Sequence, residues 1–218
     1  MGTDIHNWEP ITLSETERIF SVLPVKWMIA GGWALDLHAG KQSRPHGDID
    51  IVLFREEHVA AFDLLSAECE LYKAEKGKLS RWRQGEYLSA TKDIWARRIG
   101  GSSWAFQMML VDTEQGDWVY RRETAIRRAA AEILVRTKEG IPYLRPEIQL
   151  LYKGGSSDIR EKDEQDLQRM LPLLSEDEKQ WLTSALIAQF PRGHRWVDAI
   201  RQTYSVCRTA IDNVEGTR

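Results

Sequence analysis

The sequence is poor in cysteine and has no long apolar segment. Only Cys69 and Cys207 occur, far apart and without the spacing of metal ligands, which favours a reducing compartment. No run of about 18 apolar residues is present, so no membrane-spanning helix is expected. The N-terminus also lacks the basic start and apolar stretch of a signal peptide. Together these absences predict a cytoplasmic protein.

The sequence also lacks a strong excess of either charge. Lys and Arg number 30 against 33 Asp and Glu, and the formal net charge is -3. Such a balance gives no global attraction to nucleic acid or to an anionic membrane, so neither is expected as a partner. One basic run, Arg121, Arg122, Arg127 and Arg128, is more typical of a solvent-facing helix than of a nucleic-acid surface.

The two halves of the chain have different residue patterns. In residues 1–120, short apolar runs bounded by Gly and Pro alternate with amphipathic segments, which predicts strands and helices together. From Arg121 onward, Ala, Leu, Glu, Gln and Lys dominate at helical spacing. The pattern predicts an α+β fold, with a mixed sheet flanked by helices in residues 1–120 and a helical domain in residues 121–218. The C-terminal helices are expected at 145–154, 157–174, 175–190 and 193–211.

Capping signals place three helix ends. Ser14 with Glu17 and Ser175 with Glu178 each match the capping box, in which the two side chains satisfy backbone N–H groups at a helix start. Gly40 follows an apolar segment and is typical of the residue just after a helix. Helices are therefore expected to begin after Ser14 and Ser175 and to end at Gly40.

One stretch concentrates the chemistry, GGWALDLHAGKQSRPHGDIDI, from Gly31 to Ile51. Asp48 and Asp50 lie on a predicted strand, so their side chains would project from one face about 7 Å apart. Two carboxylates so close repel each other unless a cation lies between them. Mg²⁺ favours a pair of carboxylates completed by substrate phosphates. Asp48 and Asp50 are therefore candidate metal ligands.

The rest of this stretch suits an anion. Gly31 and Gly32 follow a predicted strand, where the absence of Cβ atoms lets the backbone approach a phosphate and helix N–H groups receive its oxygens. Arg44 and His46, just before the carboxylates, would neutralise further phosphate charge. The order of these residues predicts one site for a metal-bound polyphosphate.

The motif resembles the signature of small nucleotidyltransferases that modify aminoglycosides and lincosamides, within the polymerase-β-like superfamily. A later stretch, PEIQLLYKGGSSDIREKDEQDL, resembles the helical region of that family and contains Lys153. The resemblance covers roughly residues 14–175 and implies a nucleotidyltransferase-type sheet. It implies Mg²⁺ on Asp48 and Asp50, and nucleotide contacts from the motif residues Gly31, Gly32, Arg44 and His46 and from Lys153.

The resemblance also implies a reaction. A hydroxyl of a small acceptor would attack the α-phosphorus of a nucleoside triphosphate, with ATP expected, and pyrophosphate would leave. Metal ions would stabilise charge on the attacking and leaving oxygens. The implied acceptor is a small hydroxylated molecule of the aminoglycoside-like antibiotic class, and antibiotic resistance is the implied role.

The family pattern is incomplete at one catalytic position. Such enzymes usually carry a third carboxylate on a neighbouring strand, and the apolar pattern of SWAFQMMLVD places Gln107 there. A glutamine amide cannot accept a proton near neutral pH. Asp112 lies five positions on and falls on the opposite strand face. Other carboxylates that loops could supply are Glu86, Asp93 and Glu114.

Gln107 leaves two other functions open. The chain could bind a nucleotide with degenerate catalysis, in which case restoring an acid at position 107 should create activity. It could also be an antitoxin-linked nucleotidyltransferase that modifies a protein or a transfer RNA, a reading that rests on superfamily analogy alone.

Overall fold

The computed structural model describes residues 4–203, so Cys207 and the last part of the helix expected at 193–211 lie outside them. The chain divides into two compact units. The first comprises residues 1–121 and 127–145, and the second comprises residues 122–126 and 146–218. Among the described residues, no helix is both long and apolar enough to cross a membrane.

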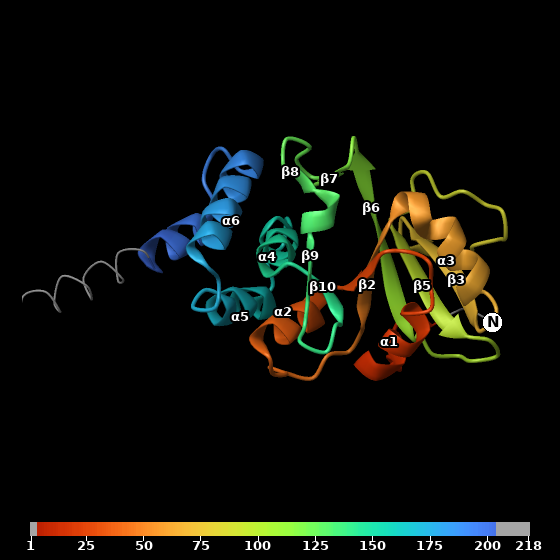
Figure 1. The fold of residues 1–218 in the computed structure, drawn as a ribbon. Coiled ribbons are helices and arrows are strands. Elements are labelled where there is room, and N and C mark those ends of the chain that lie inside the picture. The colour runs from red at the N-terminus through yellow and green to blue at the C-terminus, as the bar shows by residue number, and fades with distance from the viewer. Residues whose placement is uncertain (1–3, 204–218) are drawn as a thin grey trace, which may run out of the picture. The chain divides into compact units, whose positions relative to one another are not determined.

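The first unit is built on a mixed sheet with the strand order β4-β3-β5-β6-β2-β1-β10-β9 (Figure 1). β2 pairs parallel with β6 and β1 pairs parallel with β10, whereas the other neighbours in this path are antiparallel. This sheet and its helices confirm the expected α+β class. The strands are β1 (Trp27–Ile29), β2 (Asp50–Phe54), β3 (Cys69–Glu75), β4 (Lys78–Arg81), β5 (Asp93–Arg98), β6 (Phe106–Glu114), β7 (Asp117–Val119), β8 (Arg127–Ala129), β9 (Leu134–Arg136) and β10 (Pro142–Leu144).

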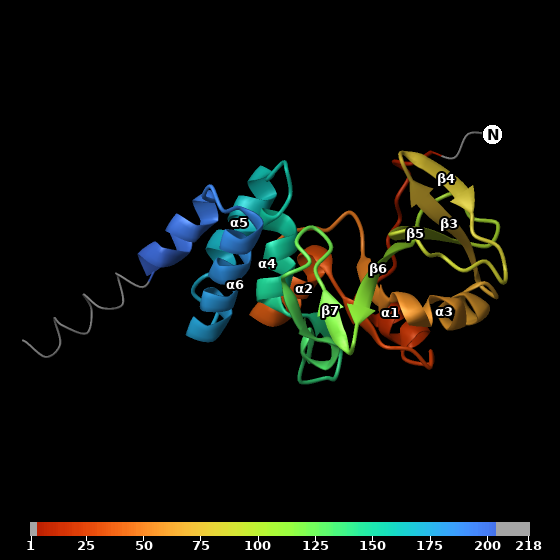
Figure 2. The same ribbon diagram turned by 90° about the horizontal axis from the view of Figure 1, so that it is seen from above.

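The helices of this unit leave part of the sheet surface polar. Figure 2 shows α1 and α3 along the same face of the sheet. Phe20 of α1 packs on that face against Trp27 and Phe106, with ring centroids 5.5 Å apart in each pair. Because side chains alternate along a strand, Gln107, next to Phe106, belongs to the opposite face. The helices are α1 (Leu13–Phe20), α2 (Gly31–Ala39) and α3 (His58–Leu65), with short 3-10 helices η1 (Arg55–Glu57) and η2 (Ala130–Glu132).

The first helix begins two residues earlier than the capping signal indicated. The capping box uses Thr12 and Glu15, although Ser14 and Glu17 have the same spacing. The N–H of Ile11 donates to the Ala105 carbonyl at 3.0 Å, which holds the chain against the sheet just before the helix starts. This tertiary contact decides between two boxes that are equivalent in sequence.

The other two capping predictions are confirmed. Ser175 accepts a hydrogen bond from the backbone N–H of Glu178, and the Glu178 side chain accepts one from the backbone N–H of Ser175. Gly40 ends α2 in the left-handed conformation, with φ +68°. Local sequence was sufficient at these ends because the stabilising groups lie within a few residues of one another.

The division between the units differs from the boundary expected at residue 121. Residues 127–145 belong to the first unit, because β10 pairs parallel with β1 through Tyr143 and Ile29, and β9 pairs with β10. Arg127 and Arg128 lie on β8 rather than on a helix, and Arg127 forms an ion pair of 2.7 Å with Glu114. Strands of three residues are too short to leave a recognisable alternation in the sequence.

The second unit is helical, as the composition indicated. It contains α4 (Pro146–Gly154), α5 (Glu161–Met170) and α6 (Glu176–Gln189), and residues 195–203 are also helical. Gly154 lies so close to the Trp196 ring that a Cβ there would be 2.5 Å from a ring carbon. The His194 ring and the Gly154 carbonyl also form a hydrogen bond of 3.0 Å, which ties the last described helix to the end of α4.

A fully buried histidine joins α3 to the following loop. His58 Nε2 accepts a hydrogen bond from the Leu88 N–H at 2.8 Å, so Nδ1 carries the proton that it donates to the Arg55 carbonyl. Burial lowers the pKa of His58 and outweighs the hydrogen bond to Arg55, which acts to raise it. The ring is therefore neutral in the folded protein near pH 7.

We expect this histidine to make stability fall in mild acid. The unfolded chain takes up a proton at His58 below the ordinary pKa of about 6.5, whereas the native state resists it. The stability that His58 contributes is present above that pH and is lost as the pH falls through the lowered native pKa. Urea unfolding between pH 8 and pH 5 measures this slope, which should be smaller in His58→Gln. Equal slopes in both proteins would contradict the assignment.

Candidate active site

The predicted carboxylates lie at the start of β2. Asp50 is the first residue of this strand and is half-buried, whereas Asp48 is exposed just before it. Ile49 between them is fully buried, and its carbonyl accepts a hydrogen bond from the Gln107 N–H at 3.0 Å. Because Ile49 faces the buried side, side-chain alternation directs Asp50 away from that side. The prediction that both carboxylates lie on the strand is wrong for Asp48, because β2 begins only at Asp50.

Gln107 is the neighbour of Asp50 across the sheet. The two residues pair in register between the parallel strands β2 and β6. Paired residues of adjacent strands present their side chains on the same face. Gln107, which the apolar pattern of residues 103–112 places at the third position, therefore lies next to a candidate metal ligand. A catalytic role for Gln107 stays a prediction.

Gly31 brings the start of α2 against Asp50. Its φ is +66°, a conformation that glycine adopts easily, and a Cβ at this position would lie 2.3 Å from Asp50 Oδ2. The Ala30 N–H also donates to the Asp50 carbonyl at 2.8 Å. The carboxylate thus sits beside the N-terminal turn of a helix, where backbone N–H groups and the helix dipole favour negative charge.

Gly32 likewise allows side chains of the loop between α2 and β2 to approach the start of the helix. A Cβ there would lie 2.4 Å from His46 Cε1 and 2.9 Å from an Arg44 guanidinium nitrogen. The sequence pattern predicts phosphate contact alone for the two glycines. The structure adds a second reason for them, because each admits a motif side chain that any larger residue would displace. Gly31, Gly32, Arg44, His46 and Asp50 are thus brought together.

A chain of hydrogen bonds through His46 fixes this loop. His46 Nε2 lies 2.6 Å from Asp36 Oδ2, and His46 Nδ1 lies 3.1 Å from an Arg44 nitrogen. Arginine only donates, so Nδ1 is the acceptor and Nε2–H donates to Asp36. The Trp33 ring packs on His46 with a centroid distance of 4.6 Å. Both ring nitrogens of His46 therefore contact protein groups, and a nucleotide contact by His46 stays a prediction.

Asp36 is the residue that sequence reasoning missed. It is buried, and it also accepts a hydrogen bond from the Ser43 N–H at 3.0 Å. Burial raises the pKa of Asp36, but the hydrogen bonds from His46 and Ser43 outweigh it and hold the pKa below its ordinary value. The signal was its place at the end of Gly-Gly-Trp-Ala-Leu-Asp, one helical turn from the glycines.

Lys153 belongs to the second unit, on α4. Its side chain is buried, with Nζ 3.1 Å from Asp163 Oδ1 and 2.9 Å from Asp166 Oδ2. Burial raises the pKa of Asp163, but the Arg160 hydrogen bond and the Lys153 charge hold it below its ordinary value. Lys153 thus joins α4 to α5 through ion pairs with two carboxylates. Its expected contact with a phosphate stays a prediction.

Four carboxylates are candidates for the third catalytic acid, and three of them form ion pairs with cationic side chains. Asp112 pairs with Arg55, Glu86 with Lys73 and Glu114 with Arg127. Asp93 is different, because its carboxylate accepts a hydrogen bond from the Gln107 side chain at 3.2 Å. It is also the first residue of β5 rather than a loop residue.

The donor set fits a magnesium ion that also binds phosphates. Asp48 and Asp50 offer hard carboxylate oxygens, and a Mg²⁺ site commonly uses one or two carboxylates with water and substrate oxygens. Within residues 4–203, no group of three or more His, Cys, Asp and Glu side chains is placed to hold a metal by itself. Asp48 and Asp50 therefore fit a magnesium ion whose other ligands are water and phosphate oxygens.

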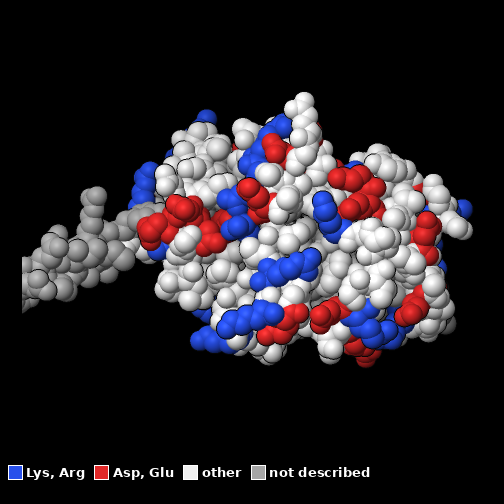
Figure 3. Space-filling model, in the orientation of Figure 1, with Lys and Arg blue, Asp and Glu red and all other residues white. Residues whose placement is uncertain are grey.

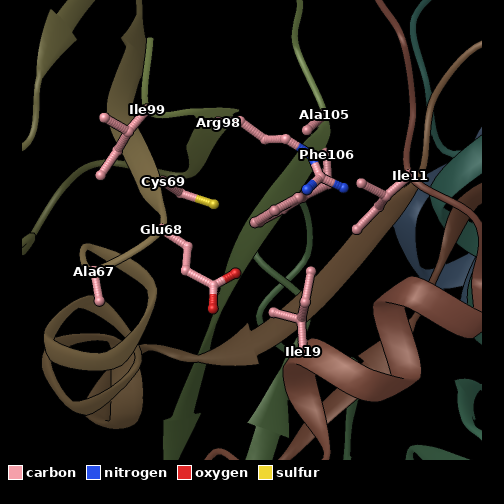
Figure 4. Close-up of a pocket in the computed structure, with 9 residues that line it drawn as sticks. All are labelled: Ile11, Ile19, Ala67, Glu68, Cys69, Arg98, Ile99, Ala105 and Phe106. Atoms are coloured by element: carbon pink, nitrogen blue, oxygen red, sulfur yellow. The ribbon is translucent and has the colours of Figure 1, made fainter. Parts of the chain in front are cut away.

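A pocket elsewhere in the first unit does not carry this chemistry (Figure 4). It is lined by Ile11, Ile19, Ala67, Glu68, Cys69, Arg98, Ile99, Ala105 and Phe106. Phe106 precedes Gln107 on β6, so it faces the opposite side of the sheet. Burial raises the pKa of the Cys69 thiol to about 11, which keeps it protonated at neutral pH and unreactive as a nucleophile.

Comparisons with known proteins identify the family and the fold of this chain. The family model described as aminoglycoside-2″-adenylyltransferase matches residues 12–170. The lincosamide antibiotic adenylyltransferase LnuA, solved with lincomycin, aligns at 19% identity over 76% of this chain and 100% of its own, with a TM-score of 0.52. ANT(2″)-Ia, in complex with adenylyl-2″-tobramycin, aligns at 13% identity over 79% of this chain and 95% of its own, with a TM-score of 0.51.

These structural likenesses establish the nucleotidyltransferase fold, and the family model extends across both units of the chain. No curated protein sequence matches. The match to residues 12–170, together with the nucleotidyltransferase fold, leads to one conclusion. The chain is a nucleotidyltransferase and belongs to the aminoglycoside-2″-adenylyltransferase family.

Proposed function

We propose that this chain is a magnesium-dependent nucleotidyltransferase that moves a nucleoside monophosphate from ATP to a hydroxyl of a small, aminoglycoside-like antibiotic. The observation that carries the proposal is the position of the Asp50 carboxylate, which lies against Gly31 at the start of α2 and in register with Gln107. The family match supports the transfer reaction, and the antibiotics named with the two solved structures support the acceptor class.

In this proposal each motif residue has a separate part. Asp48 and Asp50 hold Mg²⁺, which when bound neutralises triphosphate charge and stabilises the leaving pyrophosphate. The N-terminal turn of α2, opened by Gly31 and Gly32, receives phosphate oxygens. Arg44, held by His46 at 3.1 Å, supplies a guanidinium beside that turn.

The reaction is an in-line displacement at phosphorus. The acceptor hydroxyl oxygen forms a bond to the α-phosphorus as the bond from that phosphorus to the pyrophosphate oxygen breaks, and the hydroxyl proton leaves to a base. The protein contributes orientation and charge stabilisation rather than a covalent intermediate. A group that accepts the proton is therefore required, and Gln107 lacks the chemistry for it.

The charge distribution favours a small acceptor over a polyanion. On the face drawn in Figure 3, Lys and Arg side chains are interspersed with Asp and Glu rather than gathered into a basic strip. Arg127 of the basic run is itself paired with Glu114. A transfer RNA acceptor would require a continuous basic surface. The low cysteine content supports a cytoplasmic location, which belongs to the proposal.

Removal of magnesium tests the nucleotide site. We expect a non-hydrolysable ATP analogue to bind at least about tenfold more weakly in the presence of a chelator, because triphosphate charge would then face Asp48 and Asp50 directly. Isothermal titration calorimetry with and without Mg²⁺ measures the difference. Asp48→Asn should reduce this magnesium dependence, whereas the exposed Asp63→Asn should preserve it. An affinity that is unaffected by the chelator would refute the proposed metal site.

A further inference from the structure

A carboxylate from a strand outside the motif reaches the candidate site. Asp93 begins β5, which pairs antiparallel with β6 so that Trp95 lies opposite Gln107 and Asp93 lies opposite Met109. Side-chain alternation places Asp93, Trp95 and Gln107 on one face of the sheet. Gln107 on β6 pairs with Asp50 on the neighbouring strand β2. The candidate metal ligand Asp50 therefore lies on the same face of the sheet as Asp93.

Asp93 also contacts the position where the family pattern lacks an acid. Gln107 Nε2 donates a hydrogen bond of 3.2 Å to Asp93 Oδ1. The amide therefore holds the carboxylate beside the place that an acid at position 107 would occupy. The other three candidate carboxylates, Asp112, Glu86 and Glu114, each form an ion pair with a cationic side chain.

The surroundings of Asp93 suit a proton acceptor. The side chain is partly buried, and burial raises the pKa of Asp93. The Gln107 hydrogen bond and the positive charges of Arg121 and Lys92 act against this rise without cancelling it. A carboxylate with a raised pKa is a stronger base than a solvent-exposed one, which suits the transfer of a proton from a hydroxyl group.

We propose that Asp93 is the general base of this enzyme and replaces the missing acid at position 107. The acceptor O–H gives its proton to an Asp93 oxygen as the acceptor oxygen bonds to the α-phosphorus and the bonding electrons of the broken P–O bond leave with pyrophosphate. Gln107 is the positioning residue that holds Asp93 through its amide. The inference rests on the proposed transferase function and names the base of that same site.

The test compares kcat and KM for ATP in the native enzyme and Asp93→Asn. Asparagine preserves the size of the side chain and can still accept the Gln107 hydrogen bond, so only the base is lost. We expect kcat to fall at least about 100-fold with KM for ATP nearly unchanged. The low-pH limb of the native kcat profile should also disappear in this variant. Asp63→Asn, an exposed change on α3, should leave all three values unaltered.

A double variant separates a catalytic carboxylate from a structural one. Asp93→Asn/Gln107→Asp moves the carboxylate to the neighbouring strand, and it should recover part of the lost kcat. If Asp93 were only structural, the double variant would not recover kcat. Full kcat in the single variant Asp93→Asn would overturn the inference while leaving the transferase function intact. A native protein that transfers no nucleotide to any acceptor, although it is folded, would overturn both.

Discussion

Replacing Asp50 with asparagine is expected to lower nucleotidyl transfer at least about 1000-fold, equal to about 4 kcal/mol of transition-state stabilisation. The carboxylate lies against Gly31 and beside Gln107, where it would hold Mg²⁺ on the triphosphate. Asparagine has nearly the same shape, so packing against the glycine is retained. The substitution removes the negative charge and one hard oxygen ligand, which are the features that the reaction needs.

Initial rates of pyrophosphate release at saturating ATP and acceptor measure this effect. Far-ultraviolet circular dichroism and the unfolding midpoint of the variant should remain close to those of the native protein. Asp63→Asn is the matched control, because it removes the same charge from an exposed position on α3. An Asp50→Asn enzyme within tenfold of the native rate would show that the metal lies elsewhere.

Replacing Gly31 with alanine is expected to reduce transfer about 100-fold and to lower the free energy of unfolding by about 1–3 kcal/mol. Alanine is strained at φ +66°, and its Cβ would meet Asp50 Oδ2 at 2.3 Å. The carboxylate must therefore move away from the start of α2. A displacement of this size misplaces the candidate metal ligand relative to the phosphates.

Comparison with Gly40→Ala separates the displacement of Asp50 from the backbone strain. Gly40 ends the same helix at φ +68°, and nothing lies within 4 Å of the position that a Cβ would take. Both variants thus carry a similar backbone cost, but only Gly31→Ala displaces Asp50. Urea unfolding and transfer rates should show comparable stability losses with a much larger activity loss at Gly31. Matching activities in the two variants would mean that contact between Gly31 and Asp50 has no part in catalysis.

Local sequence was enough to locate most of the candidate site. Gly31, Gly32, Arg44, His46 and Asp50 occupy a single stretch, and the structure brings all of them together. Their proximity follows from one short helix and one turn between two neighbouring strands, so few residues of chain have to be placed. The face of β6 on which Gln107 lies was also predictable, since apolar residues mark the buried face of the strand.

Contacts between distant segments could not be read in the same way. Asp93 meets Gln107 only because β5 pairs antiparallel with β6 in one register, and no local pattern specifies that register. The three-residue strand β10 joins the first unit by pairing with β1, far away in sequence. Asp36 stood within the motif, but its part as a partner of His46 appears only when the loop folds back on α2.

Acceptor-dependent pyrophosphate release is the most direct test of the proposed nucleotidyl transfer. Native protein is incubated with Mg²⁺, each common nucleoside triphosphate and a panel of aminoglycosides and lincosamides, beside Asp50→Asn. We expect pyrophosphate release that requires an acceptor, is greatest with ATP and is lost in Asp50→Asn. Mass spectrometry should detect the nucleotidylated antibiotic. Folded protein that binds ATP but releases no pyrophosphate with any acceptor on the panel would contradict it.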